Sequence, residues 1–356
     1  HSLLLAMIFV SGCSGSSLFK EIGNNFANPI SVAVDPAANR AYVVNSNNDV
    51  TYDGASLLIL NITNPEAPAL ITTPSPRISI PNFSGQSFLN LTDHNLFLTN
   101  RLSEPPSTTD HLLRFSVVEG ATDFGVIATI ALGENPFGIA CCDGSGLAVV
   151  VNQGGTLTLF NPATPTDTTA LSLAVTLASG PVSGRGANEV ALAGNQAFVT
   201  NTVGVVYVVN TSEVGVSGKN PIDYVVTGVG VARGIASDGT NLYIVDATAG
   251  ATLLHIVPLA SIPTIDPDQS ALTELEVAKI QTTTVSLGGD PSEIALLAGK
   301  GYVTNRADNT VSVIDLANAT VVTTITVGSG PFGLAAFTAN NGKSYLYVTN
   351  LSGNSL

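Results

Sequence analysis

Two glutamates are the residues in this sequence best suited to chemistry. Glu189 in Asn-Glu-Val-Ala and Glu293 in Ser-Glu-Ile-Ala occupy the same position of two related segments, and Arg185, Arg233 and Asp290 lie in adjoining junctions. Two carboxylates near two guanidinium groups could hold a metal ion, a sugar or an acidic peptide. The favoured alternative is a set of salt bridges that offset the crowding of like charges.

The two adjacent cysteines, Cys141 and Cys142, could form a vicinal disulfide. They fall on a predicted strand, where neighbouring side chains point to opposite faces, so that bridging them requires a distorted peptide. Two separate thiols are therefore the favoured interpretation. The third cysteine, Cys13, lies far away near the N-terminus, and no Cys-x-x-Cys motif is present.

Other catalytic signatures are missing from the sequence. There is no nucleophile elbow, phosphate-binding glycine loop, zinc-protease helix or dinucleotide fingerprint, and the four histidines have no ligand spacing. Asp49, Thr51 and Asp53 begin like a calcium loop, but Leu60 replaces the distal glutamate, which favours a solvated hairpin loop. We therefore assign no catalytic residue and expect no cofactor, with a divalent cation such as calcium as an unsupported alternative.

Composition favours an all-β protein. Of 356 residues, 45% are hydrophobic and only 11% are charged, and Val, Thr, Ile, Leu, Asn and Gly are frequent. The formal net charge is −14, from 12 basic and 26 acidic residues. Because the basic residues form no cluster, the sequence excludes a nucleic-acid partner.

The first residues have the character of an export signal. Residues 3–10 read LLLAMIFV, which is too short to cross a bilayer but matches the apolar core of a signal peptide. Val10–Cys13 resembles the lipobox of bacterial lipoproteins, which implies removal of residues 1–12 and a diacylglyceryl group on Cys13. We therefore expect an exported protein, anchored to a membrane in the periplasm or on the cell surface, whose natural sequence begins before His1.

One short phrase recurs along the chain. An aromatic or apolar residue, two β-formers and Asn or Asp appear seven times at a spacing near 50 residues. The copies are Tyr42–Asn45, Phe97–Asn100, Val149–Asn152, Phe198–Asn201, Tyr243–Asp246, Tyr302–Asn305 and Tyr347–Asn350. Each follows a turn and a lead-in of small residues such as Asn135–Ala140, which suits strands that converge on an axis. This period predicts a seven-bladed β-propeller of four-stranded antiparallel blades.

The literal phrase at Tyr302–Asn305 and Tyr347–Asn350 resembles the YVTN-type β-propeller repeats of exported and surface-layer-associated bacterial and archaeal proteins. The domains expected are the signal at 1–12, a linker at 13–17 and one propeller at 18–356. The last blade stops short, and Leu18–Ile22 is predicted to supply its outermost strand. We also expect the natural chain to continue beyond Leu356.

The repeat defines a fold and says little about activity. The favoured function is a non-enzymatic lipoprotein whose propeller binds a protein or glycan partner in the cell envelope. The alternative is a propeller enzyme, such as a lactonase-like hydrolase or lyase, with a metal or substrate site at the channel mouth. Seven-bladed lactonases resemble this architecture, but their His/Glu metal ligands are not found here.

Overall fold

The computed structural model describes residues 24–49, 52, 54–71, 77–101, 110–117, 126–177, 179–263 and 273–356. The expected export signal, the lipidation site Cys13 and the closing strand Leu18–Ile22 lie outside these residues, as do parts of the loop that begins at Asp49. None of the helices in the described ranges has the length and hydrophobicity that a membrane span requires.

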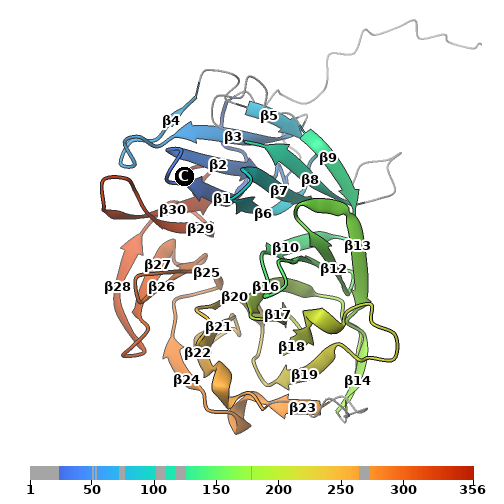
Figure 1. The fold of residues 1–356 in the computed structure, drawn as a ribbon. Helices are drawn as coiled ribbons and strands as arrows, with labels where there is room; N and C mark the ends of the chain where they lie inside the picture. The colour runs from blue at the N-terminus through green and yellow to red at the C-terminus, as the bar shows by residue number, and fades with distance from the viewer. Residues whose placement is uncertain are drawn as a thin grey trace, which may run out of the picture.

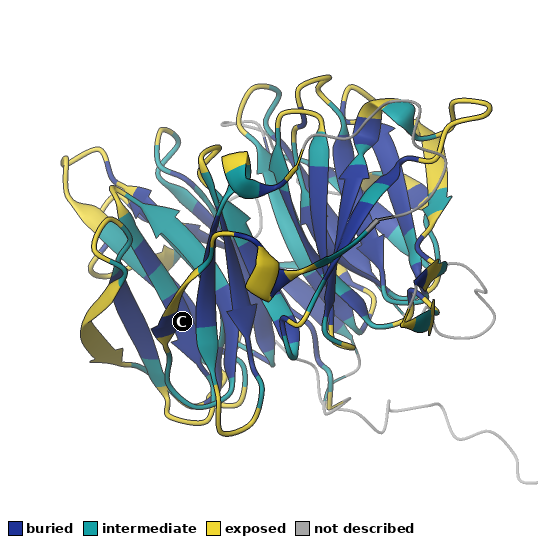
Figure 2. Ribbon diagram, turned by 90° about the horizontal axis from the view of Figure 1, so that it is seen from below, coloured by how far each residue is buried: buried dark blue, intermediate teal, exposed yellow. Residues whose placement is uncertain are grey.

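The described residues form small antiparallel sheets arranged around a central axis (Figure 1). The repeated phrase supplies the second strand of each sheet. In β17 (Gln196–Asn201), every residue from Ala197 onward is buried, because other sheets pack against both faces of the strand. Figure 2 shows this arrangement throughout the molecule: strands are largely buried, and exposed residues concentrate in the loops of the two faces. The fold is an all-β propeller.

Six sheets have four or five strands and are called blades 1 to 6. Blade 1 contains β1 (Pro29–Asp35), β2 (Arg40–Asn45), β3 (Ala55–Asn61), β4 (Ala69–Leu70) and β5 (Arg77–Ile80), and blade 2 contains β6 (Ser84–Asn90), β7 (Asn95–Asn100), β8 (His111–Ser116) and β9 (Val126–Ala131). Blade 3 contains β10 (Pro136–Ala140), β11 (Ala148–Asn152), β12 (Thr156–Asn161) and β13 (Thr164–Ser172), and a separate hairpin of β14 (Val175–Leu177) and β15 (Gly180–Val182) follows it.

Blade 4 contains β16 (Ala187–Ala193), β17, β18 (Val205–Asn210), β19 (Ile222–Thr227) and β23 (Thr273–Glu276). Blade 5 contains β20 (Ala232–Ser237), β21 (Asn241–Asp246), β22 (Leu253–Pro258) and β24 (Thr283–Ser286), and blade 6 contains β25 (Pro291–Leu297), β26 (Lys300–Asn305), β27 (Thr310–Asp315) and β28 (Thr320–Thr326). Short 3₁₀ helices occur at Thr211–Glu213, Leu259–Ser261 and Val277–Lys279.

The prediction of seven four-stranded blades is wrong in number, since the structure has six. The seventh repeat forms only a two-stranded sheet, β29 (Pro331–Thr338) and β30 (Ser344–Asn350), which we call the terminal hairpin. After β30 the chain doubles back, and the amide of Asn350 donates to the carbonyl of Ser355 at 2.8 Å. The residues after the repeated phrase therefore form a turn where the other repeats form a third strand.

The terminal hairpin nevertheless closes the ring, because β29 lies between β1 and β25. Phe337 and Tyr347 pack into a hydrophobic cluster with residues of blade 1. The Tyr347 hydroxyl donates to the carbonyl of Pro65 at 3.0 Å, and the Asn340 side chain donates to that of Pro36 at 2.8 Å. Closure among the described residues thus uses side-chain packing and hydrogen bonds between neighbouring sheets.

The insertion at 258–281 contains the sequence ALTELEVAKI, which predicts a short helix on the rim, but the structure differs from that prediction. Thr273–Glu276 forms β23, which pairs in parallel with β19 as a fifth strand of blade 4, and only Val277–Lys279 is helical. In a strand over Thr-Glu-Leu-Glu, Glu274 and Glu276 lie on one face and Leu275 lies on the other, which suits an edge strand.

The threonine of the repeated phrase joins consecutive blades. The Thr304 hydroxyl accepts from the amide of Glu293 at 3.1 Å and donates to the carbonyl of Phe332, in the next sheet, at 3.1 Å. Thr200 repeats the arrangement with Glu189 and Arg233. Each hydroxyl therefore holds an inner strand of its own blade and the inner strand of the following sheet at a defined separation.

We predict that Thr304→Val destabilises the protein by about 2 kcal/mol, because valine keeps the shape but leaves two buried backbone groups without their partner. Urea denaturation measures this loss. Thr304→Ser is the matched control, since it retains the hydroxyl and should recover most of the stability. Equal losses in both variants would show that the threonine methyl, and not the hydroxyl, stabilises the junction.

Candidate functional site

A β-bulge at the start of each inner strand directs one residue per sheet toward the central channel. The strand register shifts at this point in all six blades and in the terminal hairpin. A bulge re-aims side chains and increases the local twist. The residues Ser31, Gln86, Glu189 and Glu293, from blades 1, 2, 4 and 6, consequently line one cavity of about 200 Å³.

Glycine occupies the corresponding position in the remaining sheets. A Cβ atom added to Gly138 would lie 2.5 Å from the carbonyl oxygen of Asn188 and 3.0 Å from Oε2 of Glu189. Gly234 and Gly333 similarly allow the neighbouring inner strand to approach closely. The cavity thus exists because small residues alternate with long polar ones around the ring.

The two glutamates meet inside this cavity. Glu189 is 5% exposed and Glu293 is 9% exposed, and their carboxyl groups are close enough to influence each other's ionisation. The amide nitrogen of Gln86 donates to Oε2 of Glu293 at 3.0 Å. Oε1 of Glu189 is buried and has no hydrogen-bond partner among the described residues. An acceptor of this kind carries a desolvation cost unless a ligand or water supplies a donor.

Burial controls the ionisation of the pair. Desolvation raises the pKa of Glu189 well above its ordinary value, and the negative charge of Glu293 raises it further. Desolvation also raises the pKa of Glu293, to about 7, although its hydrogen bonds with Glu189 and Gln86 oppose the shift. Because two adjacent buried carboxylates cannot both ionise cheaply, the pair holds a shared proton near neutral pH. Such a pair can exchange a proton or accept a cation.

The predicted arginines lie apart from the carboxyl pair. Arg185 forms an exposed ion pair with Glu134 at 3.1 Å, and Arg233 pairs with Asp290 at 2.7 Å. Both ion pairs lie at the junctions between blades, and in each the carboxylate compensates the charge of the arginine. The structure therefore brings together Glu189 and Glu293 and separates them from the guanidinium groups.

Two phenylalanines from separate parts of the ring of sheets contact each other. Phe137 in β10 directly precedes Gly138, and Phe332 in β29 directly precedes Gly333, the glycines at the positions equivalent to Glu189 and Glu293. The strands β10 and β29 are not neighbours around the ring. Their rings nevertheless meet edge to face with centroids 6.2 Å apart, so they contact each other across the channel. Arg101 and Arg306 stack on the two rings at 5.3 and 5.4 Å, and burial lowers the pKa of Arg101.

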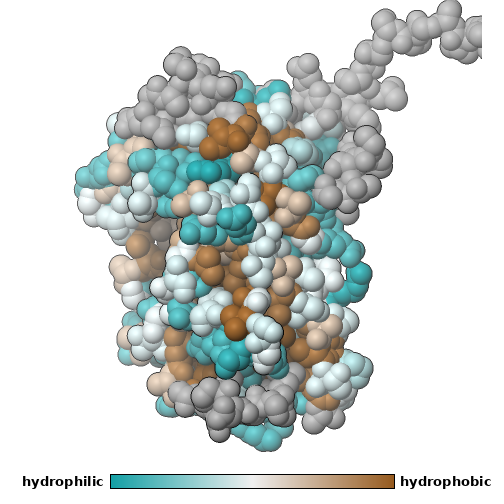
Figure 3. Space-filling view, turned by 45° about the vertical axis from the view of Figure 1, so that its right-hand side comes forward, coloured by the Kyte–Doolittle hydropathy of each residue, from teal (hydrophilic) through white to brown (hydrophobic). Residues whose placement is uncertain are grey.

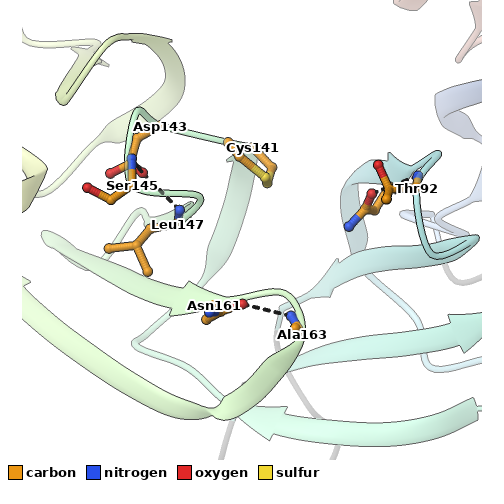
Figure 4. Close-up of a disulfide and its surroundings, with 9 residues drawn as sticks. Thr92, Cys141, Asp143, Ser145, Leu147, Asn161 and Ala163 are labelled. Carbon is orange, nitrogen blue, oxygen red and sulfur yellow. Dashed lines mark hydrogen bonds between the residues drawn. A yellow bond between two sulfur atoms is a disulfide. The ribbon is translucent and has the colours of Figure 1, made fainter.

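The adjacent cysteines lie at the other end of β10 from Phe137. A disulfide joins Cys141 and Cys142 just after the strand ends at Ala140 (Figure 4). The sequence analysis favoured separate thiols, because neighbouring side chains in a strand point to opposite faces. The strand ends at Ala140, before the cysteines, so this constraint does not apply to them. The following turn is held by Asp143, whose carboxylate accepts from the amides of Ser145 and Leu147 at 2.8 Å.

Sequence reasoning missed Gln86 and Ser87. Their segment, Ser-Gly-Gln-Ser-Phe, lacks the pair of an aliphatic residue and alanine that ends the other lead-ins. One signal could have revealed them, since Gln86 precedes Asn100 by 14 residues, as Ser31 precedes Asn45. In the described part of the chain, no group of three or more His, Cys, Asp or Glu side chains is arranged to hold a metal ion.

Comparison with known proteins supports the fold and leaves the family open. No protein-family model matches the chain, and no curated protein matches it. Among solved structures, a hydrazine synthase chain of Kuenenia stuttgartiensis is similar with a TM-score of 0.63 at 12% identity, over 96% of this chain and 99% of that one. A functionally unknown protein of Desulfotomaculum acetoxidans DSM 771 has a TM-score of 0.59 at 12% identity, over 91% and 90%. At this identity the likeness shows a β-propeller and no activity.

Proposed function

We propose that this protein is a non-enzymatic binding module, exported and anchored through Cys13, whose channel site recognises a protein or glycan partner in the cell envelope. The observation that carries the proposal is the buried carboxyl pair with an acceptor oxygen of Glu189 that lacks a partner. Both kinds of partner present donors to such a site, as hydroxyl groups of a sugar or as amino and guanidinium groups of a protein.

The residues around the pair favour binding over catalysis. Apart from the two glutamates, the described cavity lining consists of aliphatic residues, serines, glycine and Gln86. Neither serine is activated by a base in the structure, since Ser31 and Ser87 hydrogen-bond to each other through their hydroxyl groups at 2.8 Å. An activated nucleophile needs a general base within hydrogen-bond reach. The site therefore has acceptors for a ligand but no nucleophile–base pair.

The distribution of exposed hydrophobic side chains favours a binding site in the channel over one on an apolar outer face. The large exposed hydrophobic side chains are spread over several elements, including Val126 and Ile127 in β9 and Val321, Val322 and Ile325 in β28. On the side drawn in Figure 3, hydrophobic groups alternate with hydrophilic ones. Interaction surfaces that depend on hydrophobic contact usually form larger continuous patches.

Native mass spectrometry of the protein extracted gently from its own membrane tests the proposal. We expect the wild type to carry a bound partner or ligand, and the denatured intact mass to show a diacylglyceryl group on Cys13. The double variant Glu189→Gln, Glu293→Gln should keep the lipid and lose the ligand, because the carboxylates that accept its donors are gone. Glu134→Gln, which removes an exposed carboxylate outside the channel, should retain both.

An unlipidated wild type without a ligand would contradict the proposal. A ligand retained equally by the wild type and the double variant would place recognition outside the channel.

The second candidate function is a lactonase-like hydrolase or lyase. It is favoured by the shared proton and by the pKa of about 7 at Glu293, which suits a general base near neutral pH. Turnover of a lactone that rises as Glu293 ionises and disappears in the double variant would favour the enzyme. Ligand retention without turnover favours the binding module.

A further inference from the structure

We propose that Glu189, Glu293 and Gln86 form a binding site for a hard divalent cation of the Ca²⁺ class inside the propeller channel. The inference deepens the proposed function and rests on it, since it names the chemistry that the same cavity recognises. Ca²⁺ prefers six to eight oxygen ligands, which carboxylates, amide carbonyls, backbone carbonyls and waters supply.

The first ligand is already free to coordinate. Oε1 of Glu189 is buried inside the fold and has no hydrogen-bond partner among the described residues. The side chain lines the cavity and is 5% exposed. A carboxylate oxygen in this position is stabilised by a cation far more than by water, because the surroundings screen charge weakly.

Glu293 and Gln86 complete a three-sided arrangement. The Gln86 amide nitrogen lies 3.0 Å from Oε2 of Glu293. Rotation of this amide by half a turn exchanges its nitrogen and oxygen, so the group that now donates to the carboxylate can present a carbonyl oxygen instead. The three side chains come from blades 2, 4 and 6, so an ion bound by them would connect every second blade across the channel.

The rest of the cavity supplies room and further oxygens. The hydroxyl groups of Ser31 and Ser87 lie 2.8 Å apart in the same cavity. A volume of about 200 Å³ exceeds that of an ion alone and leaves space for several waters, at about 30 Å³ each. Hard cations retain such waters when the protein provides few carboxylates.

The donor set selects the kind of cation. In the described lining, no histidine or cysteine side chain faces the cavity, so the nitrogen and sulfur ligands preferred by Zn²⁺ and Cu⁺ are missing there. Once a bound cation displaces the shared proton, two positive charges balance two carboxylates, whereas a monovalent ion leaves one buried negative charge uncompensated. The site therefore favours Ca²⁺ over Zn²⁺ and over Na⁺.

Calorimetric titration of the chelator-treated full chain with CaCl₂, with MgCl₂, ZnCl₂ and NaCl as comparisons, tests the inference. We expect one Ca²⁺ per chain, and a Tm that rises by about 3 °C at saturation because the ion binds only the folded ring. Glu189→Gln should weaken binding by about tenfold or more, since affinity follows the number of charged ligands. Glu134→Gln removes an exposed carboxylate and should bind Ca²⁺ as the wild type does.

A wild type that shows neither heat nor a change in Tm with Ca²⁺ overturns the inference, whatever the variants do. Equal weakening in Glu134→Gln and Glu189→Gln overturns it as well, because the effect would then come from net charge. Tighter binding of Zn²⁺ or Na⁺ than of Ca²⁺ contradicts the assigned cation class. If the wild type retains an organic ligand in native mass spectrometry but binds no Ca²⁺, the cation fails and the binding module stands.

Discussion

Replacement of both channel glutamates by glutamine is expected to stabilise the protein by about 3 kcal/mol at pH 8 and to change its stability little at pH 4, in the presence of a chelator. Glutamine has nearly the same shape and can still hydrogen-bond within the pair and to Gln86. The gain at high pH is the cost of keeping Glu189 and Glu293 together in a buried site once the unfolded chain has ionised them.

The direction follows from the proton balance. Burial raises the pKa of both carboxyl groups in the folded state, to about 7 for Glu293, whereas in the unfolded chain a glutamate titrates near its ordinary value. Between these values the folded state binds more protons than the unfolded state, so wild-type stability falls as pH rises. The fall should extend from about pH 5 to beyond pH 7 and be much smaller in the double variant.

Urea denaturation at pH values from 4 to 8 measures the difference. Asp223 needs its own control, because desolvation raises its pKa to about 6 and it titrates in the same range. Asp223→Asn should flatten only part of the wild-type profile and leave the contribution of the glutamates. Parallel pH profiles for the wild type and the double glutamine variant would show that the pair is not a buried, proton-sharing pair in solution.

Truncation of Phe137 to alanine is expected to destabilise the protein by about 4 kcal/mol. Phe137 is 3% exposed, contacts Phe332 across the channel and lies beneath the guanidinium group of Arg101. Alanine removes the aromatic ring and leaves a void in the core, and it also removes the cation–π contact with Arg101. Because the contact between Phe137 and Phe332 joins sheets that are not adjacent, its loss should lower the stability of the whole propeller.

Urea denaturation at a single pH measures this loss, and two variants sharpen it. Phe137→Leu retains most of the buried apolar volume and should lose much less stability. Phe332→Ala should lose less than Phe137→Ala, because Phe332 is only partly buried. A loss below about 1 kcal/mol for Phe137→Ala would mean that the two aromatic rings do not pack against each other in solution.

The repeated phrase was enough to predict a β-propeller, because it specifies a local unit. A short run of β-formers that ends in Asn needs cover on both faces, and only neighbouring copies provide it. The role of its last residue is local as well: the side chain of Asn305 donates to Thr310 and Ser312, and that of Asn152 to Thr156 and Thr158. Alignment of the copies also placed Glu189 and Glu293 at equivalent positions, and both line the channel cavity.

Features that depend on contacts across the ring of sheets could not be predicted from the repeated phrase. Three examples are the six blades in place of seven, the partners of Arg185 and Arg233, and the course of the segment at 273–279. Each depends on which residues distant in the sequence lie close by in space. Thr-Glu-Leu-Glu, for example, becomes a strand because β19 offers an open edge for it.

The sequence by itself determined the repeating unit, its lead-in of small residues and the equivalence of Glu189 and Glu293 within it, because these follow from local spacing and side-chain size. Only the tertiary structure decided which side chains meet. Glu189 reaches Glu293 and Gln86 because blades 2, 4 and 6 converge on one axis, and Phe137 reaches Phe332 for the same reason. Burial then raises the pKa of the paired carboxyl groups, an effect of their surroundings that no local pattern encodes.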